Sequence, residues 1–336
     1  MGRSLSEQVI VLTGASSGIG RETALQFARR GAKLALAARN EDALDTLAAE
    51  VERLGGEALV VPIDVSDFNR VAELAARAAE RFGRIDTWVN NASVSTYGFV
   101  EQMDVAEIRR VIEVNLLGEI HGMKAALPHL REAGGTIINV SSTLGKRAVP
   151  LQAAYCAAKH GVVAFGEALR LELRHAKVPV HVVDVLPSSV NTPLFEHARS
   201  KLGVLPRPIA PIYEPRVVAE TIVAVAERPV RQVFAGGAGR LLEVGQRLSP
   251  SLVDRYLLGP GRIVEGQRTD QPDDGQDNLD EPSKGSGQST GQFGQESKSI
   301  SLYTRAFGLH PVRGRLAGAA VLVGAVAALR WAGRRE

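Results

Sequence analysis

Residues 9–31, VIVLTGASSGIGRETALQFARRG, combine an apolar run, a glycine-rich turn and an amphipathic helix pattern. This order predicts a strand, a loop and a helix that together hold a dinucleotide. Glycines permit a tight turn and let backbone N–H groups approach a pyrophosphate at a helix N-terminus, where the dipole favours negative charge. The alternative is a plain glycine-rich turn between strand and helix. The candidate ligand contacts in this loop are Gly14, Ser16, Ser17, Gly18, Ile19 and Gly20.

A second apolar run, KLALAAR at residues 33–39, predicts the next strand. In such a nucleotide-binding unit, a residue about 20 positions further on contacts the adenosine ribose. No carboxylate stands there to accept from a 2′-hydroxyl, whereas Arg39 offers a guanidinium suited to a 2′-phosphate. We therefore expect NADP(H) rather than NAD(H), the alternative being that Arg39 is a solvated loop charge. Glu41 and Asp42 fit the charged first turn of the following helix.

Strand and helix patterns alternate along the first 240 residues or so. The alternation predicts an α/β fold, with a Rossmann-type, doubly wound parallel sheet of about seven strands. Ligands bind such sheets beyond the carboxyl ends of the strands, where Asp64, Asn90 and Asn91 fall, although an Asn pair can equally cap a turn. The further strand patterns cover residues 58–65, 84–93, 135–142, 178–187 and 231–237, and the helix patterns cover 41–54, 69–81, 105–127 and 215–227.

Tyr155 and Lys159 stand four residues apart in the stretch SSTLGKRAVPLQAAYCAAK, residues 141–159. On a helix this spacing places both side chains on one face, where they can meet a single ligand. Ser141 and Ser142 lie just upstream, at the end of an apolar strand pattern. A phenol, an ammonium and a hydroxyl that converge on one point indicate proton transfer to or from an oxygen. The alternative is a packing tyrosine beside an ordinary solvated lysine.

Composition excludes several classes of protein. The 336 residues carry a formal net charge of only +3, and no basic stripe interleaved with aromatics is visible in the first 260 residues, which argues against a nucleic-acid partner. Cys156 is the only cysteine, so we expect no disulfide framework, no metal cluster and a reducing compartment. The first residues, MGRSLSEQ, lack the apolar core of a secretory signal. These features predict a cytoplasmic catalytic domain.

Several motifs occur in the order typical of one family. They are TGASSGIG at residues 13–20, Asp64, NNA at 90–92, Asn115 inside a helix, Ser142, and YCAAK, which spans Tyr155 to Lys159. Over about the first 240 residues the chain therefore resembles the short-chain dehydrogenase/reductase family, in the branch that marks NADP preference by a basic residue after the second strand. Two loop positions depart from the family pattern: Ser93 and Ser188 replace the usual glycines.

The resemblance implies a reaction and a role for each site residue. Tyr155 is expected to transfer a proton during NADP(H)-dependent interconversion of a carbonyl and a secondary alcohol. Lys159 is expected to lower the pKa of the phenol and bind the nicotinamide ribose, Ser142 to polarise the carbonyl, and Asn115 to anchor a relay water. The cofactor contacts implied beyond the glycine loop and Arg39 are Asp64, Val65, Asn91, Ala92, Tyr155, Lys159, Pro187, Val190 and Thr192.

The resemblance and the sequence also indicate a partner subunit and a class of substrate. The family commonly pairs through the helices that bear Asn115 and Tyr155, so a homo-oligomer is expected. Residues 193–212 form the expected substrate loop, and its apolar side chains indicate an apolar carbonyl or alcohol, although the same side chains could pack a lid helix. They are Leu194, Phe195, Leu202, Val204 and Leu205. The rival interpretation is a non-catalytic dinucleotide-binding or scaffold protein of this fold, tethered to a membrane.

The composition changes beyond Arg262. Residues 266–299 are poor in apolar side chains and rich in Gly, Gln, Ser and Asp, which predicts a disordered linker. The run Leu316–Leu329 is uncharged for 14 residues and flanked by arginines, short of the roughly 20 residues that a spanning helix needs. We expect a C-terminal membrane anchor, the alternative being a hydrophobic helix that docks on protein. The predicted parts are a catalytic domain at 1–262, a linker at 263–300 and a hydrophobic segment at 301–336.

Overall fold

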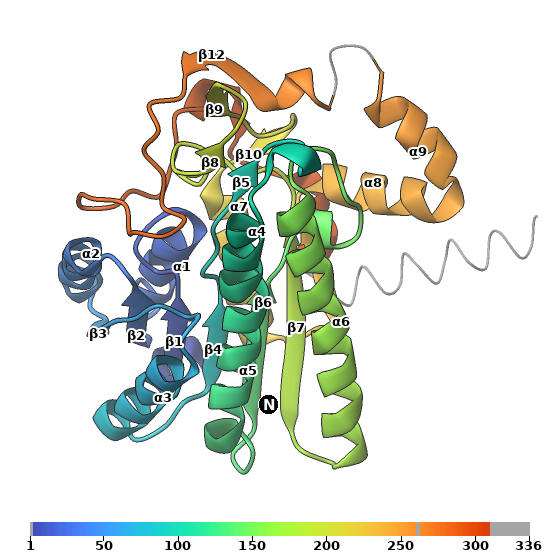
Figure 1. Ribbon diagram of the computed structural model, residues 1–336. Coiled ribbons are helices and arrows are strands. Elements are labelled where there is room, and N and C mark those ends of the chain that lie inside the picture. The colour runs from blue at the N-terminus through green and yellow to red at the C-terminus, as the bar shows by residue number, and fades with distance from the viewer. Residues whose placement is uncertain (1–2, 260–262, 310–336) are drawn as a thin grey trace, which may run out of the picture.

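The centre of the molecule is a parallel sheet of seven strands in the order β11-β7-β6-β4-β1-β2-β3 (Figure 1). The computed structural model describes residues 3–259 and 263–309. The predicted α/β, doubly wound fold is confirmed. The strands are β1 (Val9–Thr13), β2 (Lys33–Ala38), β3 (Glu57–Pro62), β4 (Thr87–Asn90), β6 (Gly135–Val140), β7 (Val180–Pro187) and β11 (Gln232–Ala235).

Helices cover both faces of the sheet and bury two separate apolar layers. One face packs against α1 (Gly18–Ala28), α2 (Glu41–Arg53) and α7 (Pro215–Glu227). The other face packs against α3 (Phe68–Phe82), α4 (Val105–Ile112), α5 (Gly118–Leu130) and α6 (Ala153–His175). Because both faces are covered, β1 is buried along its whole length, which explains its continuous apolar sequence.

The β1–α1 turn follows the glycine pattern closely. Gly14 has a φ of 64°, in the left-handed region that favours glycine. A Cβ at Gly20 would lie only 2.0 Å from the carbonyl oxygen of Gly14. The turn is therefore as tight as the sequence predicts, and helix α1 begins at Gly18 directly above the end of β1.

The helix expected at residues 105–127 is divided. α4 ends at Ile112, a π-helical turn occupies Glu113–Leu117, and α5 continues from Gly118 to Leu130. Asn115 lies inside this π turn and is completely buried. Both of its side-chain groups bond to the backbone of Val94, with Oδ1 accepting at 2.9 Å and Nδ2 donating at 2.8 Å. This contact with a loop 21 residues away stabilises the irregular turn.

The region after β11 contributes much of the upper part of the molecule in Figure 1. Helices α8 (Gly237–Leu248) and α9 (Pro250–Leu257) pack together beside the sheet edge. Three small two-stranded sheets join the substrate-loop region to neighbouring segments. Their strands are β5 (Thr96–Tyr97), β8 (Arg199–Ser200), β9 (Val204–Pro206), β10 (Ile212–Tyr213), β12 (Arg268–Pro272) and β13 (Ser297–Lys298).

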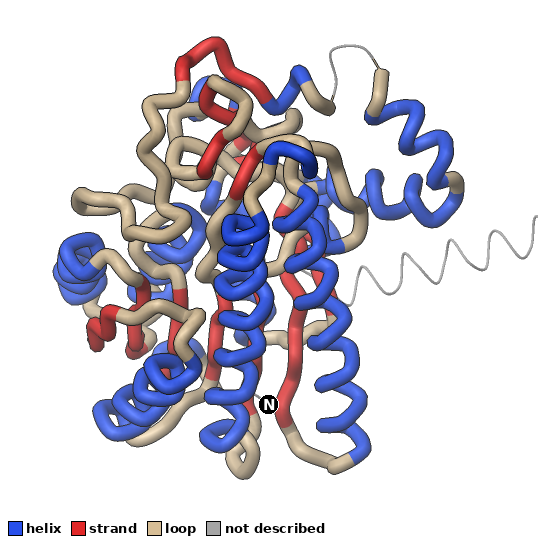
Figure 2. Tube along the Cα trace, in the orientation of Figure 1, coloured by secondary structure: helices blue, strands red, loops and turns tan. Residues whose placement is uncertain are grey.

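Residues 263–309 pack on the α/β fold, which differs from the disordered linker that the composition predicts. Most of this segment is loop in Figure 2, yet Leu279 within it is completely buried. Several of its backbone N–H groups bond to carbonyl oxygens elsewhere in the fold, such as that of Asn278 to His197. No helix among residues 3–259 and 263–309 is long and apolar enough to cross a membrane. The run Leu316–Leu329 lies outside the described residues, and the division into three parts stays a prediction.

Candidate active site

A cavity of about 1390 Å³ opens at the carboxyl ends of the parallel strands. This is where ligands bind in open α/β sheets. It brings together most of the predicted site residues, while Gly20 and Asn115 lie behind its wall. The predicted residues that line it are Gly14, Ser16, Ser17, Gly18, Ile19, Arg39, Asp64, Val65, Asn91, Ala92, Ser142, Tyr155, Lys159, Pro187, Val190 and Thr192.

Ser142, Tyr155 and Lys159 meet on one side of this cavity. β6 ends at Val140, so Ser142 follows the carboxyl end of a central strand, and its hydroxyl accepts from the Leu144 N–H at 3.0 Å. α6 places Tyr155 and Lys159 one turn apart, with the Lys159 Nζ 5.8 Å from the centroid of the phenol ring. Ser141 also lines the cavity, but its hydroxyl donates to the carbonyl of Lys159 at 3.1 Å and so fastens the end of β6 to α6.

The phenol of Tyr155 experiences opposing effects. Burial raises the pKa of Tyr155, while the positive charge of Lys159 and a hydrogen bond with the Ser142 side chain lower it; burial is the larger effect in this structure. Lys159 and Ser142, which counteract the effect of burial on this pKa, are therefore the neighbours that would make the phenol an effective acid and base.

Glu119 is a site residue that the sequence did not reveal. Its Oε1 accepts from the Lys159 Nζ at 2.7 Å, and Nζ also donates to the carbonyl of Val140 at 2.9 Å. Burial raises the pKa of Glu119 to about 7, against the attraction of Lys159. The Oε2 atom has no hydrogen-bond partner among the described residues. Glu119 stands one helical turn after Asn115, and only that spacing could have drawn attention to it.

The two asparagines after β4 have different tasks. Asn91 donates to the carbonyl of Gly14 at 3.0 Å and of Thr13 at 3.2 Å, so it fastens the glycine loop. Asn90 is buried under the floor of the site and donates to Asn139 Oδ1 at 3.0 Å. Neither merely caps a turn.

Arg39 and Asp64 line one end of the cavity. Burial raises the pKa of Asp64, but hydrogen bonds from Arg110 and Ser66 outweigh burial and hold that pKa below its ordinary value. Arg39 does not project freely into the cavity. Its guanidinium donates to the carbonyl oxygens of Asn278, Leu279 (3.4 Å) and Asp280 (2.8 Å).

The opposite end is formed by the loop after β7. Thr192 approaches the glycine loop closely, since a Cβ at Gly18 would lie 3.2 Å from the Thr192 Cβ. Ser188, one of the departures from the family pattern, donates to the carbonyl of Gly236 at 3.0 Å and accepts from the Gly239 N–H at 3.0 Å. This hydroxyl ties the loop to the start of α8.

Apolar side chains line part of the cavity. Leu194 and Phe195 line the cavity, whereas Leu202 and Val204 pack in a neighbouring cluster and Leu205 is partly buried outside the cavity lining. The segment forms the short strands β8, β9 and β10 rather than a lid helix. Helices α8 and α9 supply further lining that the sequence did not predict, namely Leu241, Leu242, Tyr256 and Leu257.

Comparisons with known proteins agree with this arrangement. The sequence profile described as short chain dehydrogenase matches residues 8–203. An uncharacterized oxidoreductase of Bacillus subtilis, YxnA, is 40% identical over 258 residues, which cover 76% of this chain and 72% of that protein. The trans-4-hydroxycyclohexanecarboxylate dehydrogenase of Sinomonas cyclohexanicum is 38% identical over 208 residues, which cover 60% of this chain and 80% of that protein.

A solved structure adds a likeness in three dimensions. An alcohol dehydrogenase from the archaeon Thermococcus sibiricus, complexed with 5-hydroxy-NADP, aligns with a TM-score of 0.60 at 30% sequence identity. The alignment covers 68% of this chain and 95% of that chain.

Proposed function

The chain belongs to the short-chain dehydrogenase/reductase family of oxidoreductases, and from this premise we propose that it interconverts a carbonyl and a secondary alcohol with NADP(H). The observation that carries the proposal is the meeting of Ser142, Tyr155 and Lys159 in the same cavity as the glycine loop. A module that only binds dinucleotides has no need of a phenol so placed beside an ammonium.

The residues present fit a nicotinamide dinucleotide. The glycine loop lines one side of the cavity, and a Cβ at Gly14 would lie 2.6 Å from the Ala92 Cα, so only glycine allows this close approach of backbones. Pro187, Val190 and Thr192 would face the nicotinamide, and Asp64 and Val65 the adenine. Such a cofactor, when bound, supplies or accepts the hydride.

The side chains supply the proton chemistry. During reduction the carbonyl oxygen gains negative charge, and Tyr155 Oη donates its proton to that oxygen. Ser142 holds the oxygen by a hydrogen bond, so that the charge develops against fixed donors. The Lys159 ammonium stabilises the phenolate that remains and would bond to the nicotinamide ribose. In alcohol oxidation the same groups work in reverse.

Two finer features complete the proposal. NADP(H) is favoured over NAD(H) because Arg39, rather than a carboxylate, stands after β2. The substrate is proposed to be an apolar carbonyl or alcohol, because Leu194, Phe195 and the α8–α9 leucines line its side of the cavity.

The substitution Tyr155→Phe tests the assignment. It removes the proton donor while it keeps the ring, so turnover should fall by about 100-fold or more. NADPH affinity, measured by fluorescence titration, should change by less than about twofold, because the hydroxyl is not part of the adenosine site. A carbonyl and alcohol panel followed at the nicotinamide absorbance gives the rate. Substantial residual turnover would refute the role of Tyr155, and nucleotide binding without turnover of any compound by the unaltered chain would favour the scaffold interpretation.

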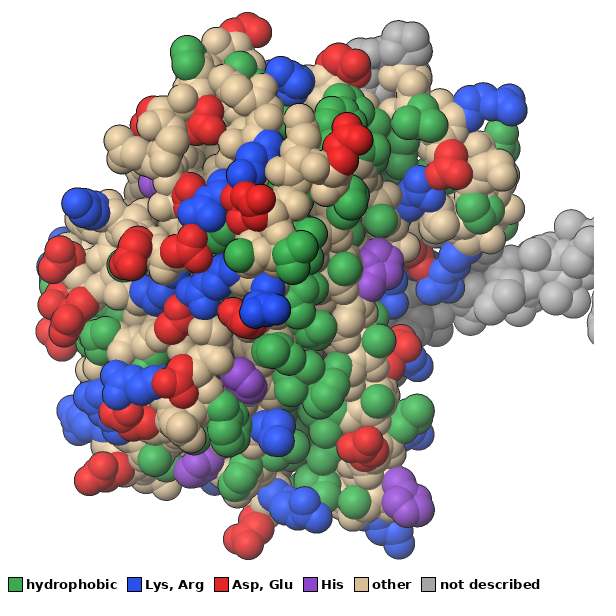
Figure 3. Space-filling model, in the orientation of Figure 1, with side chains coloured by type: hydrophobic (Ala, Val, Ile, Leu, Met, Phe, Trp, Pro, Cys, Tyr) green, Lys and Arg blue, Asp and Glu red, His purple; other side chains and the backbone are tan. Residues whose placement is uncertain are grey.

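Self-association is also proposed. Hydrophobic side chains gather over the α4, α5 and α6 face in Figure 3, which is unusual for a surface that meets only water. On these three helices and the π turn between α4 and α5, the large exposed hydrophobic side chains are Val105, Leu117, Phe165 and Leu171. We propose that two copies of the chain pair through these helices.

The uncharged run Leu316–Leu329 supports one more proposal, a membrane tether for the catalytic domain. It rests on sequence alone.

A further inference from the structure

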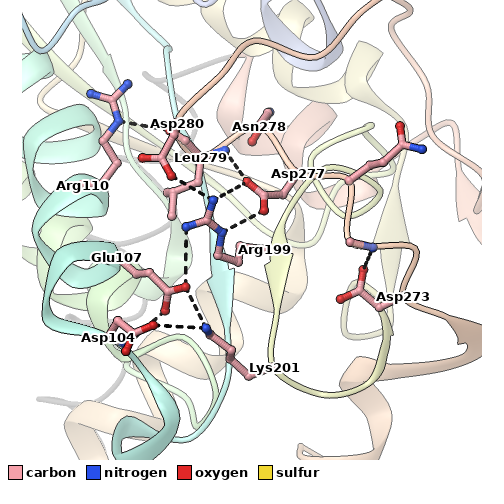
Figure 4. Close-up of polar contacts among 12 residues, drawn as sticks. Asp104, Glu107, Arg110, Arg199, Lys201, Asp273, Asp277, Asn278, Leu279 and Asp280 are labelled. Atoms are coloured by element: carbon pink, nitrogen blue, oxygen red, sulfur yellow. Dashed lines mark hydrogen bonds and ion pairs between the residues drawn. The ribbon is translucent and has the colours of Figure 1, made fainter.

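Residues 277–293, called the strap here, cross the cofactor side of the cavity as an extended loop. The strap follows β12 and is fastened to both sides of the site. Figure 4 shows its first residues, with Asp277 and Asp280 directed at Arg199 and Leu279 beside Arg110. Asn278, Pro282 and Ser283 of the strap line the same cavity as Arg39 and Asp64.

The first end of the strap is firmly anchored. Asp277 accepts two hydrogen bonds from Arg199, at 2.8 and 3.1 Å, and Asp280 forms an ion pair with the same guanidinium at 2.9 Å. The side chain of Leu279 is completely buried in the apolar layer formed with α3, α5 and α6. Arg110, which also binds Asp64, donates to the Leu279 carbonyl at 3.1 Å.

In the middle of the strap, backbone carbonyls accept hydrogen bonds from donors near the end of the cavity that Arg39 and Asp64 line. Asn40, the N-cap of α2, donates to the carbonyls of Ser283 at 2.5 Å and Gly285 at 3.1 Å. The N–H of Gly18 donates to the carbonyl of Gln288 at 2.9 Å. The far end is fixed beside the nicotinamide loop, where Asn191 Oδ1 accepts from the Phe293 N–H at 3.0 Å.

The hydrogen bonds between Arg39 and the strap bear most directly on the binding of a 2′-phosphate. Its guanidinium bonds three successive carbonyl oxygens of the strap, from Asn278 to Asp280. Carbonyl and phosphate oxygens are alternative acceptors for the same N–H groups, and a guanidinium has only five. The carboxylates of Asp280 and Glu281 also act on this charge and would repel a phosphate.

The strap does not fill the site. The cavity that remains is lined by Asn278, Pro282 and Ser283 of the strap together with Arg39 and Asn40. A dinucleotide of either kind meets the strap at the Gly18 N–H, but only a 2′-phosphate needs the Arg39 guanidinium as well. A 2′-phosphate reaches Arg39 only if the carbonyls at residues 278–280 move away.

We propose that the strap competes with the 2′-phosphate of NADP(H) for Arg39 and thereby sets the cofactor selectivity of this chain. The inference rests on the proposed function, since it presumes that the cavity takes a nicotinamide dinucleotide. A chain whose strap is loosened should gain affinity for NADPH in particular, because the fraction of molecules with a free Arg39 rises.

Equilibrium binding to the full-length protein tests this without reference to turnover. Asp277→Asn removes the charge that pairs with Arg199, and Leu279→Ala removes the buried anchor. Each should lower the Kd for NADPH by about fivefold or more and lower the Kd for NADH by a clearly smaller factor, because the Gly18 N–H is freed for both nucleotides and Arg39 serves only the 2′-phosphate. Asp273→Asn is the matched control: it removes the same charge, and among residues 3–259 and 263–309 its side chain bonds only to the Gly275 N–H, at 3.1 Å. It should change neither Kd.

A second measurement uses the unaltered chain and does not depend on variants that fold. The amides of Asn278 and Leu279 are bonded to the His197 carbonyl and to Asp277 Oδ1, both at 2.9 Å. NADPH should speed hydrogen exchange at these amides, whereas NADH should not. Three results would overturn this inference and leave the proposed function intact. They are equal gains in affinity for NADPH and NADH in the loosened chains, weaker NADPH binding in those chains, and slower hydrogen exchange in the strap when NADPH binds. Failure of the unaltered chain to bind either nucleotide would overturn the proposed function as well.

Discussion

Glu119 and Lys159 form an ion pair in the interior, with side chains that are 2% and 1% exposed. Burial raises the pKa of Glu119 from 4.5 to about 7, so the folded chain holds a proton between these pH values that the unfolded chain has released. The free energy of unfolding should therefore decrease as the pH rises through this window. Relative to Glu119→Gln, the loss for the unaltered chain should be roughly 3 kcal/mol between pH 4.5 and 7. Urea denaturation at a series of pH values measures it.

The matched control is Glu132→Gln, which removes a carboxylate from the exposed turn after α5. Its free energy of unfolding should follow that of the unaltered chain across the same pH series. A difference between the unaltered chain and Glu119→Gln that stays constant with pH would show that Glu119 is ionised throughout the window. It would then serve only as the counter-ion of Lys159.

At the level of elements, local patterns predicted the parts of the site that local geometry determines. The spacing of Tyr155 and Lys159 needed only a helix, and Asp64 and Ser142 needed only strand ends at one edge of the sheet. The π turn at Glu113–Leu117 was not predictable, because Asn115 depends on Val94, a residue from another segment. The packing of the strap was not predictable for a similar reason. Its polar composition indicates disorder, and its partners Arg39, Asn40 and Arg199 are remote in sequence.

The face formed by α4, α5 and α6 leads to a prediction about assembly. Phe165 and Leu171 are 36% and 66% exposed on α6, and burial of such side chains favours a pair of copies. The double substitution Phe165→Ser and Leu171→Ser should therefore yield monomers where the unaltered chain forms dimers or larger assemblies. Light scattering after size exclusion gives the mass. Leu248→Ser, on α8 and 81% exposed, is the control that should leave the mass unchanged. If the unaltered chain is a monomer, the proposal that two copies pair through α4, α5 and α6 is refuted.

For the whole molecule, the described C-terminal region belongs to the catalytic body. Residues 263–309 supply the buried Leu279, the partners of Arg39 and Arg199, and the strand β13 that pairs with β10. Removal of everything after Arg262 would therefore take away part of the proposed cofactor site together with the apolar run. A truncation that is meant to test the membrane tether has to preserve this region.

A chain that ends at Leu309 meets that requirement and isolates the contribution of Leu316–Leu329. If that run holds the protein to a bilayer, the full-length chain should sediment with membranes and resist extraction by salt, because the attachment is apolar. The shortened chain should stay in the supernatant and keep its affinity for NADPH, since the strap and the cavity are intact. Full-length protein with Leu322→Asp and Val323→Asp is the control for length, and it should also stay in the supernatant. Equal partition of the full-length and shortened chains would refute the tether and leave docking on protein as the role of the run.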